Sequence, residues 1–220
     1  MEHDFWHRRW RKNEIGFHQE SINPHLLEHW PALGVAPETR VFVPLCGKSR
    51  DMRWLRDRGH TVVGIELSQK AVEAFFAEEE LAPERAKQGA VDAWKADGYT
   101  LLCGDFFALR PGDLGPVAAI YDRASLIALP PPMRVRYAAH LRGLLPAGLP
   151  SLLVTVEYAQ HEMDGPPFAV HQPEVEGLFE AWQPRLLSRH DILADAPRFR
   201  DKGVTDMHDA IYQLTTPGVA

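Results

Sequence analysis

Several features that would place this chain in a specialised class are scarce or missing. Its 220 residues include two cysteines, Cys46 and Cys103, so no framework of disulfide bonds is expected. Its apolar runs are far too short to span a bilayer, and the first ten residues, MEHDFWHRRW, lack the apolar core of a secretion signal. The formal net charge of −6 gives no basic stripe for nucleic acid. We therefore expect a cytoplasmic protein that binds neither nucleic acid nor membranes.

The chain has the composition of an ordinary globular protein, and its sequence pattern predicts β-strands that alternate with α-helices. Apolar residues make up 45% and charged residues 25% of a chain long enough for one α/β domain. Residues 1–30 predict a helical or partly helical arm, in which Trp6 and Trp10 share one helix face. Beyond it, apolar runs that read as strands cover residues 41–43, 61–65, 101–103, 117–121 and 151–156. Helices are expected over 49–58, 68–80, 134–145 and 173–182, with Ser49 and Ser68 as caps.

This alternation predicts a doubly wound, mostly parallel sheet, and apolar runs at 186–187 and 211–214 suggest two antiparallel strands at its end. Ligands of such sheets bind beyond the carboxyl ends of the strands. Residues that directly follow predicted strands should therefore share one rim. They are Leu45 to Gly47, Glu66, Asp105, Asp122 and Arg123.

The stretch VFVPLCGKSRDM, residues 41–52, ends like a phosphate-binding loop but cannot form one. Such a loop needs glycine five positions before the Gly of GKS, and that position is Phe42, inside the strand. The dinucleotide fingerprint G-x-G-x-x-G is also absent after this strand. What remains is a tight turn with one glycine, Gly47, that leads into a helix.

Glu66 stands at the tip of the second predicted strand, 19 positions after Gly47. An acid at about this spacing commonly accepts hydrogen bonds from ribose hydroxyls. The alternative is a solvated acid that caps the next helix, where Ser68 already serves. A strand-tip acid and a glycine turn without a diphosphate cradle indicate a nucleoside ligand that lacks phosphates, and S-adenosylmethionine fits that description.

Five blocks of sequence resemble the thiopurine S-methyltransferase family, nearly end to end and in the same order. They are FW…W…N…GFHQE (5–20), RVFVPLCGKSRDM (40–52), DRGHTVVGIELS (57–68), YDRASLIAL (121–129) and GPPF (165–168). The resemblance implies a class I, Rossmann-like methyltransferase with a seven-stranded sheet. It also implies a single domain, 1–220, whose N-terminal arm, 1–34, covers the cofactor and substrate pocket.

By this resemblance, four residues contact S-adenosylmethionine: Trp10, Leu45, Glu66 and Arg123. An indole face at Trp10 attracts a sulfonium cation, but Trp10 as a core anchor of the arm is the alternative. Leu45 alone would be plain core. The fork of Arg123 would pair with the cofactor carboxylate or the substrate, and its alternative is a salt bridge to Asp122 or Asp105. Asp105 is an adenine-side candidate or simply a turn-forming aspartate.

Substrate contacts are expected from Phe17, where the family places an aromatic side chain against a flat ring, and from Arg198. The stiff GPPF loop would wall the pocket. All three features have a purely structural alternative.

Two other kinds of site are weighed and set aside. His25, Glu28 and His29 match the H-x-x-E-H pattern of zinc proteases, but zinc hydrolysis needs a third protein ligand, so we predict no metal site. Cys46 as a nucleophile would need a histidine partner and a lowered pKa, so a buried thiol is the better interpretation.

The resemblance implies a monomeric cytoplasmic detoxifying enzyme that transfers a methyl group in line to an aromatic or heterocyclic thiol. Selenium and tellurium species are further acceptors associated with bacterial members. Such a thiol needs no dedicated base, and Arg123, with Arg198, would favour its anion. A methyltransferase of the same fold that acts on oxygen or nitrogen, and a binding module without turnover, are the alternatives.

Overall fold

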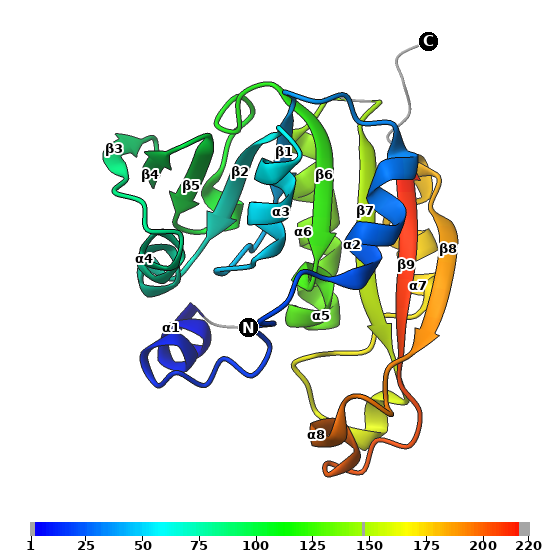
Figure 1. Ribbon diagram of the computed structural model, residues 1–220. Helices are drawn as coiled ribbons and strands as arrows, with labels where there is room; N and C mark the ends of the chain where they lie inside the picture. The colour runs from blue at the N-terminus through cyan, green and yellow to red at the C-terminus, as the bar shows by residue number, and fades with distance from the viewer. Residues whose placement is uncertain (1–2, 147, 216–220) are drawn as a thin grey trace.

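A mixed β-sheet runs through the residues that this computed structural model describes, 3–146 and 148–215 (Figure 1). The remaining positions of the predicted domain and arm, 1–2, 147 and 216–220, lie outside the described residues. Five central strands are parallel, in the spatial order β5 (Tyr99–Cys103), β2 (Thr61–Glu66), β1 (Arg40–Val43), β6 (Val117–Arg123) and β7 (Pro150–Glu157). Antiparallel strands complete both edges: β4 (Val91–Ala96) and β3 (Glu84–Gln88) beside β5, and β9 (His208–Thr215) and β8 (Arg185–Asp191) beside β7. The predicted doubly wound, mostly parallel sheet is confirmed.

Helices cover both faces of the sheet, as a doubly wound fold requires (Figure 1). One face carries α2 (Pro24–His29), α3 (Asp51–Asp57) and α4 (Gln69–Glu78), and the other carries α5 (Ser125–Ala128), α6 (Pro131–Leu144) and α7 (Gln172–Leu178). Two further helices, α1 (His3–Arg11) and α8 (Pro197–Arg200), lie beyond the carboxyl ends of the strands. Within the described part of the chain, no helix combines the length and apolarity needed to cross a membrane.

Successive side chains of a strand point to opposite faces of the sheet, so each buried strand contributes to two hydrophobic cores. In β1, Phe42 packs in the cluster that includes Tyr137 of α6, whereas Val41 and Val43 pack in the cluster that includes Leu55 of α3. All five of these side chains are buried, and each stabilises the fold by roughly 1.5–3 kcal/mol. This double burial holds the strand tips in fixed positions, which is what a binding site at the rim needs.

The sheet has nine strands over the described residues, not the seven expected, because the hairpin β3–β4 extends one edge. Its outer strand, ERAKQ, is almost wholly exposed and has no apolar alternation. Such an edge strand gives no burial signal in the sequence, so the expectation missed it.

Helix boundaries differ from the expectation in two informative places. The helix expected over 173–182 ends at Leu178, and a short 3₁₀ turn, Glu180–Trp182, follows it. Ser68 occupies the N-cap position of α4, as predicted, but its side chain makes no capping hydrogen bond. Ser49 Oγ, in contrast, accepts a hydrogen bond from the Asp51 amide at the start of α3, at 3.2 Å.

Candidate functional site

The turn that follows β1 is held in an unusual backbone conformation. Leu45 and Gly47 both have positive φ, 45° and 54°. This conformation is strained for leucine, and such strain clusters at functional sites. The Cys46 amide donates to the Ile65 carbonyl at 3.0 Å, which fastens the turn to the neighbouring strand. The predicted one-glycine turn is thus present, with Leu45 half-buried beside it.

Glu66 ends β2 and binds the backbone of two turns. Its Oε2 accepts a hydrogen bond from the Gly47 amide at 3.0 Å, and its Oε1 accepts one from the Ser68 amide at 2.7 Å. The residue is only 7% exposed, so it is not the solvated acid of the alternative interpretation, although it does bind the start of α4. Burial raises the pKa of Glu66 to about 7, although the amides pull it downward. Each oxygen keeps a second lone pair for a ligand.

Arg123, at the tip of β6, is paired with a residue that the sequence analysis did not single out. Its Nε donates to Asp51 Oδ2 at 2.7 Å, and its Nη2 donates to Ser49 Oγ at 3.2 Å. The expected alternative partners, Asp122 and Asp105, are therefore wrong. Asp122 cannot reach it because consecutive strand residues face opposite sides of the sheet, and its Oδ2 accepts from Tyr137 on the α6 side at 2.7 Å.

Asp51 is almost completely buried and joins three parts of the chain. Besides Arg123, it accepts hydrogen bonds from the Tyr121 hydroxyl at 2.9 Å and from the Asn23 amide at 2.8 Å. Burial lowers the pKa of Arg123, but Asp51 raises it and the net direction is upward. In the sequence, the one feature that could have pointed to Asp51 is its position in the first turn of the helix after the first strand. The sequence does not show that this helix face looks toward β6.

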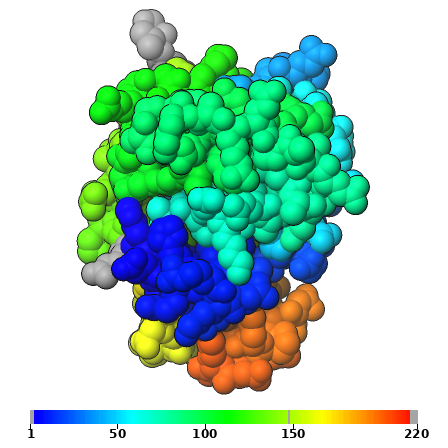
Figure 2. All heavy atoms as spheres, turned by 90° about the vertical axis from the view of Figure 1, so that its left-hand side faces the viewer, coloured from blue at the N-terminus to red at the C-terminus, as the bar shows by residue number. Residues whose placement is uncertain are grey.

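The N-terminal arm begins with α1 beyond the carboxyl ends of the strands (Figure 1), and its residues, in blue, form part of the surface on this side of the molecule (Figure 2). Trp10 is buried, and its ring lies 3.5 Å from the position that a Cβ on Gly47 would occupy. Phe17 makes edge-to-face contacts with Trp6 and Trp10, at centroid distances of 5.6 and 5.7 Å, and stays partly exposed. Lys70 Nζ also donates to the Arg11 carbonyl at 3.2 Å. The structure thus brings Trp10 and Phe17 to the first turn.

Asp105 lies at the same rim, after β5. Its Oδ1 accepts a hydrogen bond from the Phe107 amide at 2.9 Å, so it does form a turn, and its Oδ2 lies 3.4 Å from Nε2 of His3 in the arm. The interpretation of Asp105 as a turn-forming aspartate is confirmed. A contact with adenine stays a prediction.

Arg198 belongs to α8, and the GPPF loop packs beside α5. Nη1 of Arg198 lies 3.5 Å from the position of a Cβ on Gly16, next to Phe17 in the arm. The Phe168 amide donates to the Ile127 carbonyl of α5 at 2.7 Å, and Tyr158 Oη donates to the Pro167 carbonyl at 2.7 Å. Residues far apart in the sequence therefore meet here, while their contact with a substrate stays a prediction.

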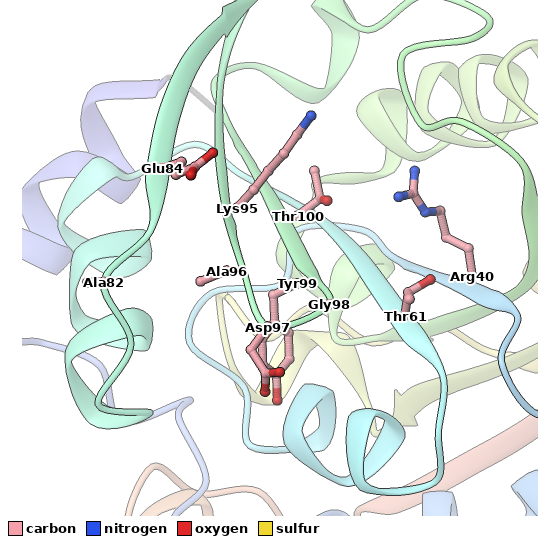
Figure 3. A pocket seen from close by; sticks show the side chains of 10 residues that line it. All are labelled: Arg40, Thr61, Ala82, Glu84, Lys95, Ala96, Asp97, Gly98, Tyr99 and Thr100. Carbon is pink, nitrogen blue, oxygen red and sulfur yellow. The ribbon is translucent and has the colours of Figure 1, made fainter.

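The Cys46 thiol and a surface hollow are not assigned a part in this site. Cys46 is buried, and burial raises the pKa of its thiol well above the ordinary value, which confirms a structural thiol. An open hollow of about 530 Å³ lies at the other end of the parallel strands, where β4 turns into β5 and β2 begins (Figure 3). The tips of the parallel strands point away from this hollow, so we do not assign the ligand to it.

Solved structures share this architecture and define the class of the fold. An S-adenosylmethionine-dependent methyltransferase from Anabaena variabilis superposes with a TM-score of 0.64 at 15% identity, over 96% of this chain and 94% of that one. The 1,6-didemethyltoxoflavin-N1-methyltransferase of Burkholderia thailandensis, solved with S-adenosylhomocysteine, gives 0.65 at 14% identity, over 98% and 87%. The fold is that of the class I S-adenosylmethionine-dependent methyltransferases.

Sequence comparison narrows this class. The family model described as thiopurine S-methyltransferase matches residues 1–217. Proteins named thiopurine S-methyltransferase are 49% identical in Pseudomonas fluorescens, over 100% of both chains, and 51% identical in Nitrosospira multiformis, over 98% of this chain and 99% of that one. The chain belongs to the thiopurine S-methyltransferase family, and S-adenosylmethionine is its methyl donor.

The Asp51 network makes a prediction about stability. Replacing Asp51 by Asn keeps the shape but leaves the guanidinium of Arg123 buried without its counter-charge. We expect the free energy of unfolding to fall by about 3–5 kcal/mol, measured by urea denaturation. The matched control is Asp57→Asn at the end of α3, because Asp57 is exposed and lies 4.0 Å from Arg53. Its effect should stay within about 0.5 kcal/mol, and equal stabilities of both variants would contradict the assigned role of Asp51.

Proposed function

We propose that this enzyme methylates the sulfur of aromatic or heterocyclic thiols. The observation that carries the proposal is the aromatic pair Trp10 and Phe17 above the Gly47 turn, between the tips that carry Glu66 and Arg123. A flat ring would pack against the partly exposed face of Phe17 at this place. The names of the relatives, thiopurine S-methyltransferases, support the same class of acceptor.

Glu66 is the proposed ribose ligand of the cofactor. Its carboxylate is already fixed by two amides and keeps a lone pair on each oxygen, which suits two adjacent hydroxyl groups. The turn at Leu45 and Gly47 offers backbone contacts without a phosphate cradle, as a nucleoside without phosphates requires. Trp10 would cover the cofactor from the arm, and Asp105 would face its adenine side.

The residues of this site act by positioning. S-adenosylmethionine supplies an electrophilic methyl group, which a thiolate takes up in line while S-adenosylhomocysteine leaves. Nη1 of Arg123 makes no hydrogen bond to the residues described here, so it would donate to the cofactor carboxylate or to the anionic acceptor. Because Asp51 fixes this guanidinium, its direction is set before any ligand binds. Holding the reacting atoms in line can supply roughly 7–11 kcal/mol of the barrier.

Sulfur is favoured over oxygen or nitrogen as the acceptor because the carboxylates near the rim are engaged in other contacts or face away from it. Glu66 is bound to two amides, Asp51 is paired with Arg123, and Asp122 faces the other side of the sheet. An alcohol or a protonated amine would need one of them as a general base. A heterocyclic thiol is already largely a thiolate at neutral pH and needs none. Selenium and tellurium species, which are softer still, fall within the same proposal.

The physiological setting is also part of the proposal. We place the enzyme in the cytoplasm as a monomeric detoxifying enzyme, which agrees with a small-molecule acceptor. The partner expected is the thiol substrate alone, with no nucleic acid and no membrane.

Acceptor specificity tests the proposed function directly. Transfer of a radiolabelled methyl group to a thiopurine should exceed transfer to the hydroxy and amino analogues of the same ring by more than about tenfold in kcat/KM, a difference of at least about 1.4 kcal/mol. Faster methylation of the oxygen or nitrogen analogue would overturn the assignment of sulfur. Binding of S-adenosylhomocysteine without transfer to any acceptor would indicate a binding module instead.

Removal of the proposed ribose ligand should weaken cofactor binding. For Glu66→Ala we expect a loss of about 1.5–3 kcal/mol in the binding of S-adenosylhomocysteine, measured by isothermal titration calorimetry, because hydrogen bonds to a charged group are lost. Glu73→Ala on the exposed face of α4 is the matched control and should bind as the wild type does. Equal affinities of the wild type and the folded Glu66→Ala variant would remove Glu66 from the site.

The raised pKa of Glu66 predicts how cofactor affinity depends on pH. With a ligand-free pKa of about 7, the ionised fraction rises from roughly one tenth at pH 6 to nine tenths at pH 8. Because the ribose hydroxyls bind the ionised form, affinity for S-adenosylhomocysteine should rise about tenfold over this interval. Glu66→Gln, which does not titrate, should show a flat profile, and a wild-type affinity that falls with pH would contradict the proposed role.

A further inference from the structure

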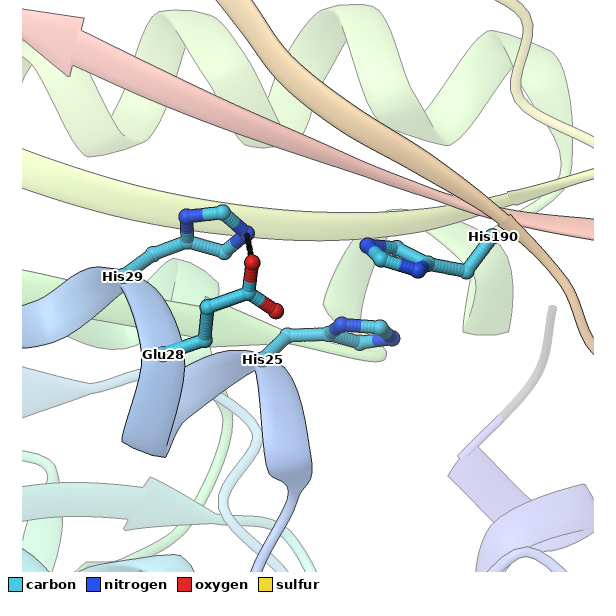
Figure 4. A group of neighbouring side chains, drawn as sticks. All are labelled: His25, Glu28, His29 and His190. Carbon is cyan, nitrogen blue, oxygen red and sulfur yellow. Dashed lines mark ion pairs between the residues drawn. The ribbon is translucent and has the colours of Figure 1, made fainter.

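Three histidines from distant parts of the sequence meet beside α2. His25 and His29 lie four residues apart on this helix, and His190 comes from β8 (Figure 4). With Glu28, each offers one ligand atom, and these four atoms lie within 4.8 Å of one another. The prediction of no metal site assumed that a third protein ligand was missing, and this premise does not hold once β8 is in place.

Two buried ring nitrogens in this cluster lack a hydrogen-bond partner among the described residues. They are Nδ1 of His25 and Nε2 of His190, whose rings are 4.8 Å apart between centroids. Buried polar atoms are nearly always satisfied, so two such atoms in one cluster need an explanation. A metal ion would satisfy both at once.

The other nitrogen of His25 is already held in the way that metal ligands usually are. Nε2 of His25 lies 3.0 Å from Oδ2 of Asp209 on β9. Donation of the Nε2 proton to this carboxylate leaves Nδ1 with a free lone pair and fixes the ring. A carboxylate behind a histidine is the common outer arrangement of zinc sites.

We propose that His25, His29 and His190, with Glu28 as the fourth ligand, bind one Zn²⁺ ion. Imidazole nitrogens and a carboxylate oxygen are ordinary zinc ligands, at about 2.0–2.2 Å from the metal. In a tetrahedral site the ligand atoms lie about 3.3 Å apart, so the cluster must contract. The exposed Glu28 carboxylate already lies 3.8 Å from Nε2 of His29. On coordination, His29 exchanges its 2.8 Å contact with Ser188 Oγ for the metal.

Four protein ligands fill a tetrahedral site, so this zinc is structural and does not activate water. It would clamp α2 to β8. Residue Asn23 directly precedes α2, and its amide binds the Asp51 carboxylate that holds Arg123. The ion would therefore stabilise the connection between the arm and the rim. The proposal is independent of which acceptor the enzyme methylates.

Direct metal binding tests the proposal without an activity assay. Full-length protein without a histidine tag, freed of metal with EDTA, is titrated with ZnCl₂ by calorimetry, and its melting temperature is followed in parallel. We expect one Zn²⁺ per chain, a higher melting temperature with zinc, and the visible absorption of tetrahedral Co²⁺ when cobalt replaces it. His190→Ala and His29→Ala should each weaken zinc binding at least about 10–100-fold. His161→Ala, at an exposed histidine outside the cluster, is the matched control and should bind as the wild type does.

Absence of saturable one-to-one binding to the wild type would overturn the proposal. Equal zinc affinity of the wild type and a folded His190→Ala variant would overturn it as well, because the ion would then bind elsewhere. The cobalt spectrum of the wild type gives a reading that does not depend on whether a variant folds, and an octahedral spectrum would count against the site.

Discussion

The Glu66 carboxylate, held between the amides of Gly47 and Ser68, connects the two turns at which we propose that the cofactor binds. One turn follows β1 and the other follows β2, and their strands are neighbours in the sheet. The buried carboxylate fixes the spacing of both turns, and burial raises its pKa to about 7. A ligand that binds the ionised Glu66 carboxylate therefore meets a backbone that is already arranged. Such preorganisation increases affinity, because less conformational freedom is lost on binding.

A second buried carboxylate, Asp51, fixes the side chain of Arg123 at the same rim. It directs the guanidinium of Arg123 and receives the amide of Asn23, so the arm and the tip of β6 share one anion. Because Asp51 is nearly inaccessible to water, loss of its charge cannot be compensated by solvent. Both acids are thus engaged in fixing other groups of the protein, which agrees with the proposed transfer by positioning.

The sequence was informative where burial leaves a pattern and silent where contacts are long-range. The short apolar runs ending at Val43, Ile65 and Tyr121 correctly predicted a parallel sheet, since each strand is buried on both faces. The polar strand Glu84–Gln88 left no such pattern. The partner of Arg123 and the meeting of His190 with His25 depend on which faces α3 and β8 present after folding. Local periodicity does not encode that information, and the resemblance to a family could name candidate residues but not their hydrogen-bond partners.

The most direct test of the central claim is a crystal structure of the enzyme with S-adenosylhomocysteine bound. We expect both ribose hydroxyls to lie within about 2.6–3.2 Å of the Glu66 carboxylate. This carboxylate should retain its bonds to Gly47 and Ser68, and Trp10 should cover the ligand. A ligand bound at another part of the molecule, with Glu66 contacting only the backbone amides, would contradict it.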